Sequence, residues 1–139
     1  MANERRGMIT PEEAQAETAR RELARRRLQH YGEYVYPWWN PEPVHALICT
    51  ELEEVYRYID SGGREGVGNL VLEMPPQHGK TTIVSRIFAS WLLGKRPDSN
   101  IILTSYNDDL AGDNSREVRQ IVTSERFNAV FGERSAIEE

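Results

Sequence analysis

The stretch 70–82 reads Leu-Val-Leu-Glu-Met-Pro-Pro-Gln-His-Gly-Lys-Thr-Thr. A short apolar run enters a turn that ends in Gly79-Lys80-Thr81, and an amphipathic segment follows from Ile83 to Leu93. Strand, phosphate-sized loop and helix, in this order, are what a nucleotide-binding P-loop requires. In such a loop the lysine faces the outer phosphates, the threonine hydroxyl binds Mg²⁺, and backbone N–H groups cradle the anion. The stretch therefore predicts a nucleotide site.

The entrance of this loop departs from the usual pattern, which has a glycine five residues before Gly79. Met74 stands at that position and is followed by Pro75 and Pro76. Proline fixes φ and has no N–H to donate, so anion binding must rest on the N–H groups of residues 77–82. The alternative is a surface turn that happens to carry an exposed lysine.

The composition is that of one modest globular domain. The chain has 139 residues, of which 39% are hydrophobic and 28% charged, and its net charge is −5. No apolar run is long enough to span a membrane, and no signal-peptide core precedes the body. The single cysteine, Cys49, cannot form an internal disulfide, which fits a reducing cytoplasm. It lies among apolar helix positions, so we expect a buried, inert thiol.

Residues 1–32 form an arginine-rich N-terminal segment that we expect to be a helical arm. Thr10 is a candidate N-cap, Pro11 suits the first turn, and Glu13 completes a capping box. The predicted helix runs to about Gln29. One interpretation of its arginines is an arm that touches nucleic acid or a neighbouring subunit, and the other is a solvated helix face; these are Arg20, Arg21, Arg25, Arg26 and Arg27.

The rest of the chain predicts alternating strands and helices. Residues 34–43 are aromatic and proline-rich, and an amphipathic helix follows over 44–59, with Asn40 as a candidate cap. Ile101–Ser105 is a second apolar run, and its continuous apolarity suits a strand buried on both faces of a parallel sheet. Helices are predicted at about 109–123, capped by Asn107 or Asp108, and at 124–131. This order indicates an α/β fold.

About residues 34–132 carry a set of motifs that resembles the N-terminal ATPase domain of tailed-bacteriophage terminase large subunits. The most specific part is a proline pair before His-Gly-Lys-Thr, with a strand that ends in Ser-Tyr some way downstream. The residues that carry the resemblance are Trp38-Trp39, His45, Leu52-Glu53, Met74 to Thr81, Trp91, Gly94, Pro97, Thr104-Ser105-Tyr106, Leu110-Ala111, Ser115, Val118-Arg119 and Phe131-Gly132.

The resemblance implies an ATP- and Mg²⁺-binding motor that drives double-stranded DNA into a procapsid. Lys80 is the implied catalytic residue that stabilises charge on the transferring phosphoryl group, and Thr81 is the implied metal ligand. Nucleotide-binding positions are implied for Gln77, His78, Gly79, Lys80, Thr81 and Thr82. Relatives often have an arginine where this chain has Gln77, so a charge-based γ-phosphate contact is not expected there. His78 either packs within the loop or donates to a phosphate.

The family also implies partners and flanking contacts. The partners are ATP, double-stranded DNA, the small terminase subunit and the portal or procapsid, and the full-length protein is implied to form a homo-oligomeric ring. The segment 34–39 and His45 fall where the family flanks the adenine, so a base stacks on Trp38 or Trp39 unless both are used in packing. Residues 105–107 either couple nucleotide state to DNA grip or form a plain turn.

ATP hydrolysis needs an acidic pair at the end of a further buried strand. No such strand follows Ser105, and Glu138-Glu139 does not follow one. We therefore expect an α/β P-loop NTPase fold of the additional-strand type, of which residues 33–139 supply only the N-terminal half of the parallel-sheet domain. We expect weak nucleotide binding and no ATP turnover by this chain alone. The alternatives are a P-loop small-molecule kinase and a non-catalytic interaction protein with a vestigial loop.

Overall fold

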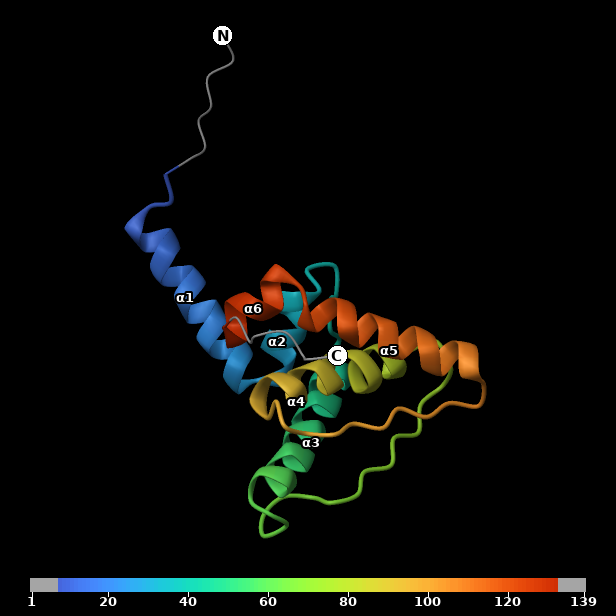
Figure 1. Cartoon of the computed structure of the whole chain (residues 1–139). Helices are drawn as coiled ribbons and strands as arrows, with labels where there is room; N and C mark the ends of the chain where they lie inside the picture. The colour runs from blue at the N-terminus through green and yellow to red at the C-terminus, as the bar shows by residue number, and fades with distance from the viewer. Residues whose placement is uncertain (1–7, 133–139) are drawn as a thin grey trace.

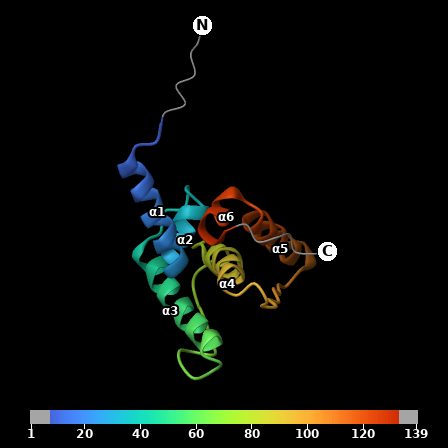
Figure 2. The ribbon, with the colours of Figure 1, turned by 60° about the vertical axis from the view of Figure 1, so that its left-hand side comes forward.

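In the computed structural model, which describes residues 8–132, every regular element is a helix (Figure 1). The helices pack around one core, and α1 leads away from the body toward the N-terminus (Figures 1 and 2). In chain order the elements are α1 (Pro11–Arg26), α2 (Leu28–Val35), α3 (Pro43–Asp60), the π-helix η1 (Thr82–Phe88), α4 (Ala89–Lys95), α5 (Asp108–Val122) and α6 (Glu125–Phe131).

The start of α1 is the one that the sequence predicts. The Thr10 hydroxyl accepts a hydrogen bond from the Glu13 N–H at 3.2 Å, and the Glu13 carboxylate accepts from the Thr10 N–H at 2.8 Å. This reciprocal pair satisfies two N–H groups that a helix start leaves unbonded. The capping box is confirmed.

The prediction of one continuous helix to Gln29 is wrong, because the chain breaks at Arg27. This residue is extended, with φ −125° and ψ 125°, and α2 starts at the next residue. The Glu53 carboxylate of α3 accepts hydrogen bonds from the Leu28 N–H at 2.8 Å and from the Arg27 guanidinium at 3.2 Å. A side chain that lies 25 residues away along the chain thus caps the second helix, where no local signal marks a start.

The arginines of α1 are mostly engaged with acidic side chains of the same helix. Arg21 bonds Glu17 at 3.0 Å, and Arg26 bonds Glu22 at 2.8 Å. Arg25 also reaches Glu22 and donates to the Val130 carbonyl of α6. These internal pairs favour the solvated, salt-bridged interpretation of this helix over a free cationic arm. None of the helices in the described part of the chain is long and apolar enough to cross a membrane.

The core is built from the apolar faces of α1 to α6 and of η1. Trp91 is its largest buried side chain, at 1% exposure, and its indole N–H donates to the Ala24 carbonyl at 3.2 Å. Tyr31 is fully buried and its hydroxyl donates to Ser90 at 2.7 Å. Both polar tips therefore have partners, as burial requires. Cys49 is buried in the same cluster, as expected.

The helix after the loop begins as an α-turn and then widens. Residues 80–95 are helical throughout, but Thr82–Phe88 has π-type hydrogen bonding before α4 resumes the α-form. Its buried residues, Ile83 and Ile87, face the core. π-turns are rare and occur frequently at functional sites. The sequence predicts an ordinary amphipathic helix here, so the widened turn is a feature that its periodicity did not reveal.

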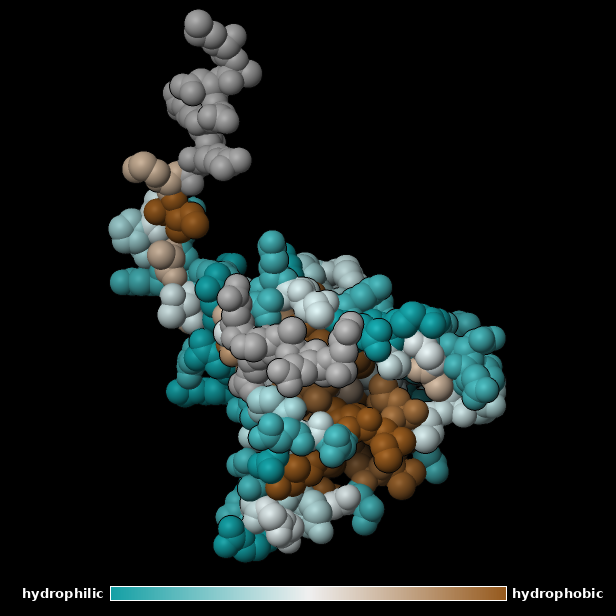
Figure 3. All heavy atoms as spheres, in the orientation of Figure 1, coloured by the Kyte–Doolittle hydropathy of each residue, from teal (hydrophilic) through white to brown (hydrophobic). Residues whose placement is uncertain are grey.

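The predicted α/β parallel-sheet fold is wrong for the described residues, which contain no strand. Segments 70–74 and 101–105 are irregular and lie outside any ladder. A strand needs a neighbour to satisfy its N–H and C=O groups, and within residues 8–132 no segment pairs with either run. Their apolarity is not buried on both faces either: Val71 is 81% exposed and Ile102 is 87% exposed. Figure 3 shows apolar residues gathered on one face of the body.

Candidate functional site

The loop between Met74 and Lys80 turns sharply because two of its residues have left-handed backbone. Gln77 has φ 64° and Gly79 has φ 81°. Gln77 is the one residue other than glycine with positive φ in the described chain, and this conformation is strained for a side chain. Strained positions of this kind cluster at functional sites. The prolines before them, Pro75 and Pro76, are exposed.

Lys80 and Thr81 stand at the start of the helix, as the sequence predicts. The Ile83 N–H donates to the Gly79 carbonyl at 3.0 Å, which places the helix start directly after the loop. Lys80 and Thr82 are half-buried, whereas Thr81 is exposed. The first N–H groups of a helix have no partner within it, and the helix end carries partial positive charge. One cationic side chain and several backbone donors are thus available on one short segment.

The side chain of His78 is used within the loop. Its Nδ1–H donates to the Pro76 carbonyl at 2.9 Å and to the Pro75 carbonyl at 3.2 Å. The ring therefore folds back over the proline pair and is bonded to both proline carbonyls. The Gln77 side chain is exposed and projects from the turn without a hydrogen bond among the described residues.

The loop also touches a residue that the sequence assigned a different role. The Nε2 of His45, in the first turn of α3, lies 2.9 Å from the His78 carbonyl oxygen. The family resemblance implies that His45 flanks an adenine, and the sequence gives no sign of a bond to a loop 33 residues away. No periodicity or spacing rule links these positions, so only the fold reveals the contact.

The two adjacent tryptophans have different environments. Trp39 packs so closely on Gly32 of α2 that a Cβ there would come within 2.5 Å of its ring. Trp38 is 68% exposed and its ring lies 4.8 Å from that of Tyr36. Packing therefore accounts for Trp39, and Trp38 is the tryptophan with an open face.

Polar side chains fix the helices around the loop. Arg86 of η1 donates to the Asn114 side chain of α5 at 3.2 Å, and Asn114 is buried at 5% exposure. The Asn107 side chain accepts from the Leu110 N–H at 2.8 Å and so caps α5, as predicted. Tyr106 beside it is 89% exposed. Asn107 is thereby occupied by a local helix cap.

The donor set of the loop fits an anion better than a bare cation. Over residues 8–132, no three His, Cys, Asp or Glu side chains are grouped to hold a metal ion. The Thr81 hydroxyl is an oxygen of the kind that contributes one ligand to a phosphate-bound Mg²⁺. Glu138 and Glu139, which we did not expect to form the catalytic acidic pair, lie outside the described residues.

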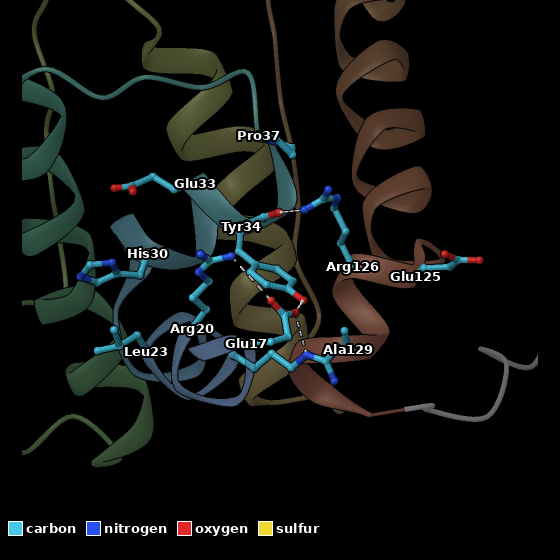
Figure 4. A pocket seen from close by; sticks show the side chains of 11 residues that line it. Glu17, Arg20, Leu23, His30, Glu33, Tyr34, Pro37, Glu125, Arg126 and Ala129 are labelled. Carbon is cyan, nitrogen blue, oxygen red and sulfur yellow. Dashed lines mark hydrogen bonds and ion pairs between the residues drawn. The ribbon is translucent and has the colours of Figure 1, made fainter. Parts of the chain in front are cut away.

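A cavity of about 740 Å³ lies away from the loop, between α1, α2 and α6 (Figure 4). The Tyr34 hydroxyl donates to Glu17 there, and the Arg126 guanidinium donates to the Tyr34 carbonyl at 3.0 Å. The hydrogen bond from Tyr34, with Arg21 beside it, lowers the pKa of Glu17. The charged side chains that line the cavity are three acidic and three basic, so their formal charges cancel; they are Glu17, Arg20, Arg21, Glu33, Glu125 and Arg126.

Comparison with known families connects the loop to a named class of protein. Residues 71–131 match the family described as the terminase large subunit, T4likevirus-type, N-terminal. No curated protein and no solved structure matches the chain. The matched segment contains the whole loop, the helical stretch after it, α5 and α6. Over residues 71–131, this chain is therefore similar to the N-terminal region of terminase large subunits.

Proposed function

We propose that the chain serves phage DNA packaging as the nucleotide-binding part of a terminase large subunit, with ATP–Mg²⁺ as its ligand. The family match supports a terminase role, and ATP binding is our extension of it. The observation that carries the extension is the turn at Gln77 and Gly79, which delivers the chain into a helix whose first residues are Lys80 and Thr81.

Each part of this segment has a chemical task in the proposal. The N–H groups of residues 77–82 donate hydrogen bonds to the phosphate oxygens, because Pro75 and Pro76 have no N–H to offer. Lys80 supplies the compact positive charge for the outer phosphates, and the Thr81 hydroxyl supplies one Mg²⁺ ligand. Gln77 contributes hydrogen bonds without charge. His78 acts on the shape of the loop, since its ring nitrogen is bonded to the proline carbonyls.

The proposal extends to partners of the whole packaging machine. Double-stranded DNA, the small terminase subunit, the portal or procapsid and further copies in a ring are the partners that a terminase large subunit serves. The internal pairing of the α1 arginines means that they are not the first candidates for the DNA contact.

The test uses the two lysines of the chain, Lys80 and Lys95. A fluorescent ATP analogue with Mg²⁺ is titrated against the wild type, Lys80→Gln and the matched control Lys95→Gln. A charge-assisted contact is worth about 1.5–3 kcal/mol, so Lys80→Gln should bind roughly 10- to 100-fold more weakly. Lys95→Gln should stay near wild type, because Lys95 lies over the rings of Tyr56 and Trp91 instead. Equal binding by all three proteins contradicts the proposal and favours an interaction protein with a vestigial loop.

The metal part of the proposal has its own control. Thr81→Val keeps the shape of the side chain and removes the hydroxyl, while Thr82→Val does the same one residue later. Binding of the analogue by Thr81→Val should lose its dependence on Mg²⁺, and Thr82→Val should retain it. A Mg²⁺ dependence that is unchanged in Thr81→Val contradicts the assignment of Thr81.

A further inference from the structure

His45 uses both of its ring nitrogens. The Nδ1 atom accepts a hydrogen bond from the Glu42 N–H at 2.9 Å, at the start of α3. The Nε2 atom lies 2.9 Å from the His78 carbonyl oxygen, which has only lone pairs to offer. The hydrogen must therefore be on Nε2, and the ring is the neutral tautomer that accepts on one side and donates on the other.

The loop has few other restraints. Pro75 to His78 are all exposed, and the ring of His78 bonds only to the two proline carbonyls just before it. Within residues 8–132, the bond from His45 is the one hydrogen bond that joins the loop to the N-terminal half of the chain. Met74 before the turn and Ile83 after it pack at the core, and the bond from His45 restrains the exposed turn between them.

The ring of His45 is itself well supported. Two residues of the next helical turn, Ile48 and Cys49, are buried in the core. The ring of Trp39 lies 6.3 Å from that of His45, and Trp39 rests on Gly32 of α2. The imidazole therefore links the exposed turn to α2 and α3.

The geometry of a peptide unit gives this contact a specific effect. The carbonyl of His78 and the N–H of Gly79 belong to one planar trans peptide, so they point in opposite directions. A donor that holds the carbonyl toward α3 necessarily directs the Gly79 N–H away from α3. Gly79 has φ 81°, a conformation that most other residues resist, so this peptide orientation is built into the turn.

We propose that His45 is a positioning residue of the loop: its Nε2–H bond to the His78 carbonyl fixes the orientation of the Gly79 N–H for binding the phosphates of a nucleotide. The bound class, a nucleoside triphosphate, rests on the function proposed above. The orientation of the loop does not, and it can be measured without nucleotide.

Two substitutions separate the two hydrogen bonds of the ring. In His45→Asn the amide oxygen occupies roughly the place of Nδ1 and can still accept from the Glu42 N–H, but the side chain is too short to reach His78. In His45→Gln the amide nitrogen reaches the place of Nε2 and restores the donor. His30→Asn is the matched control, since His30 is an exposed histidine of α2.

The first measurement is amide hydrogen exchange of the nucleotide-free protein. The loss of one hydrogen bond should speed exchange in peptides that cover residues 75–82 about five- to tenfold in His45→Asn. Exchange in His45→Gln and His30→Asn should stay within about threefold of wild type, and peptides from α3 should be unaffected. The second measurement is the affinity for the fluorescent ATP analogue, with a loss of about fivefold in His45→Asn and recovery in His45→Gln.

The outcomes distinguish this inference from the proposed function. If the wild type binds no nucleotide but His45→Asn loosens the loop, the function is wrong and the positioning role stands. If Lys80→Gln weakens binding while loop exchange is the same in His45→Asn and wild type, the positioning role is wrong and the function stands. Equal behaviour of His45→Asn and His45→Gln, or loss of the helical circular dichroism signal in His45→Asn, also overturns it, because His45 then serves the fold.

Discussion

The buried pair of hydroxyl groups between α2 and α4 gives the sharpest prediction about stability. Tyr31 and Ser90 are both fully buried. The Tyr31 hydroxyl donates to the Ser90 oxygen at 2.7 Å, and the Ser90 hydroxyl donates to the Ile87 carbonyl at 3.0 Å. The chain of donors has a direction, so removing its two members should have unequal effects.

The magnitudes follow from which group is left without a partner. Tyr31→Phe removes a donor and leaves Ser90 its bond to Ile87, so the expected loss is one net hydrogen bond, about 1 kcal/mol. Ser90→Ala leaves the Tyr31 hydroxyl buried and unpaired, which costs about 1–3 kcal/mol. Alanine returns at most about 0.5 kcal/mol through its better helix propensity. The double variant leaves no unpaired group, so adding Tyr31→Phe to Ser90→Ala should raise stability.

The free energy of unfolding of all four proteins of this double-mutant cycle is measured by urea titration at pH 7, followed by circular dichroism. The comparison requires the same m-value in all four proteins. We expect Ser90→Ala to be the least stable and the double variant to recover about 1 kcal/mol. Additive losses, or a Ser90→Ala protein more stable than Tyr31→Phe, would refute the direction of the hydrogen bonds.

Three further predictions concern the core and the helix starts. Burial raises the pKa of the Cys49 thiol to about 12 from its ordinary value of 9.0. Above about pH 9 the unfolded thiol ionises first, so the free energy of unfolding should fall by up to about 1.4 kcal/mol per pH unit. This fall should be less steep in Cys49→Ala. Glu53→Ala should lower stability by about 1–2 kcal/mol in a urea titration because the Leu28 N–H loses its cap, whereas Glu53→Gln, which keeps an acceptor, should lose less than half of that. Gly32→Ala should destabilise by about 1–3 kcal/mol despite its better helix propensity, because the new methyl group displaces Trp39; a thermal melt that is unchanged contradicts this packing.

The features that the sequence predicts well are those decided within one helical turn. The capping box of Thr10, the Asn107 cap of α5 and the short helix that starts after Ser124 each depend on side chains three residues apart. These helix starts are therefore recovered to within a residue or two. The end of α3 at Asp60, before a run of glycines, is of the same kind.

The features that the sequence does not reveal depend on distant partners. The break at Arg27 is stabilised by Glu53 of another helix, and the loop is held by His45. The apolar runs around Val71 and Ile102 have strand composition, yet a strand forms only where another segment completes its hydrogen bonds. The composition of these segments favours a strand, and a neighbouring backbone segment determines whether the strand forms.

The features of the candidate site also divide into those that the sequence predicts and those that it does not. The order of Gly79, Lys80 and Thr81 predicts a loop at the start of a helix, which the structure contains. The sequence does not reveal the positive φ of Gln77 or the bonds that the His78 ring makes to the two proline carbonyls. Neither feature of Gln77 and His78 has a periodic signature in the sequence, so only the three-dimensional structure shows them.

The graded burial of the three tryptophans makes the protein its own optical probe. Trp91 is 1% exposed and Trp38 is 68% exposed, so iodide should quench the emission of Trp38 and leave that of Trp91 untouched. Trp39 lies between these extremes, beside the imidazole of His45. A variant that retains only Trp39 therefore has a fluorophore next to the residue that holds the loop, and movement of the turn becomes visible in emission without any attached dye.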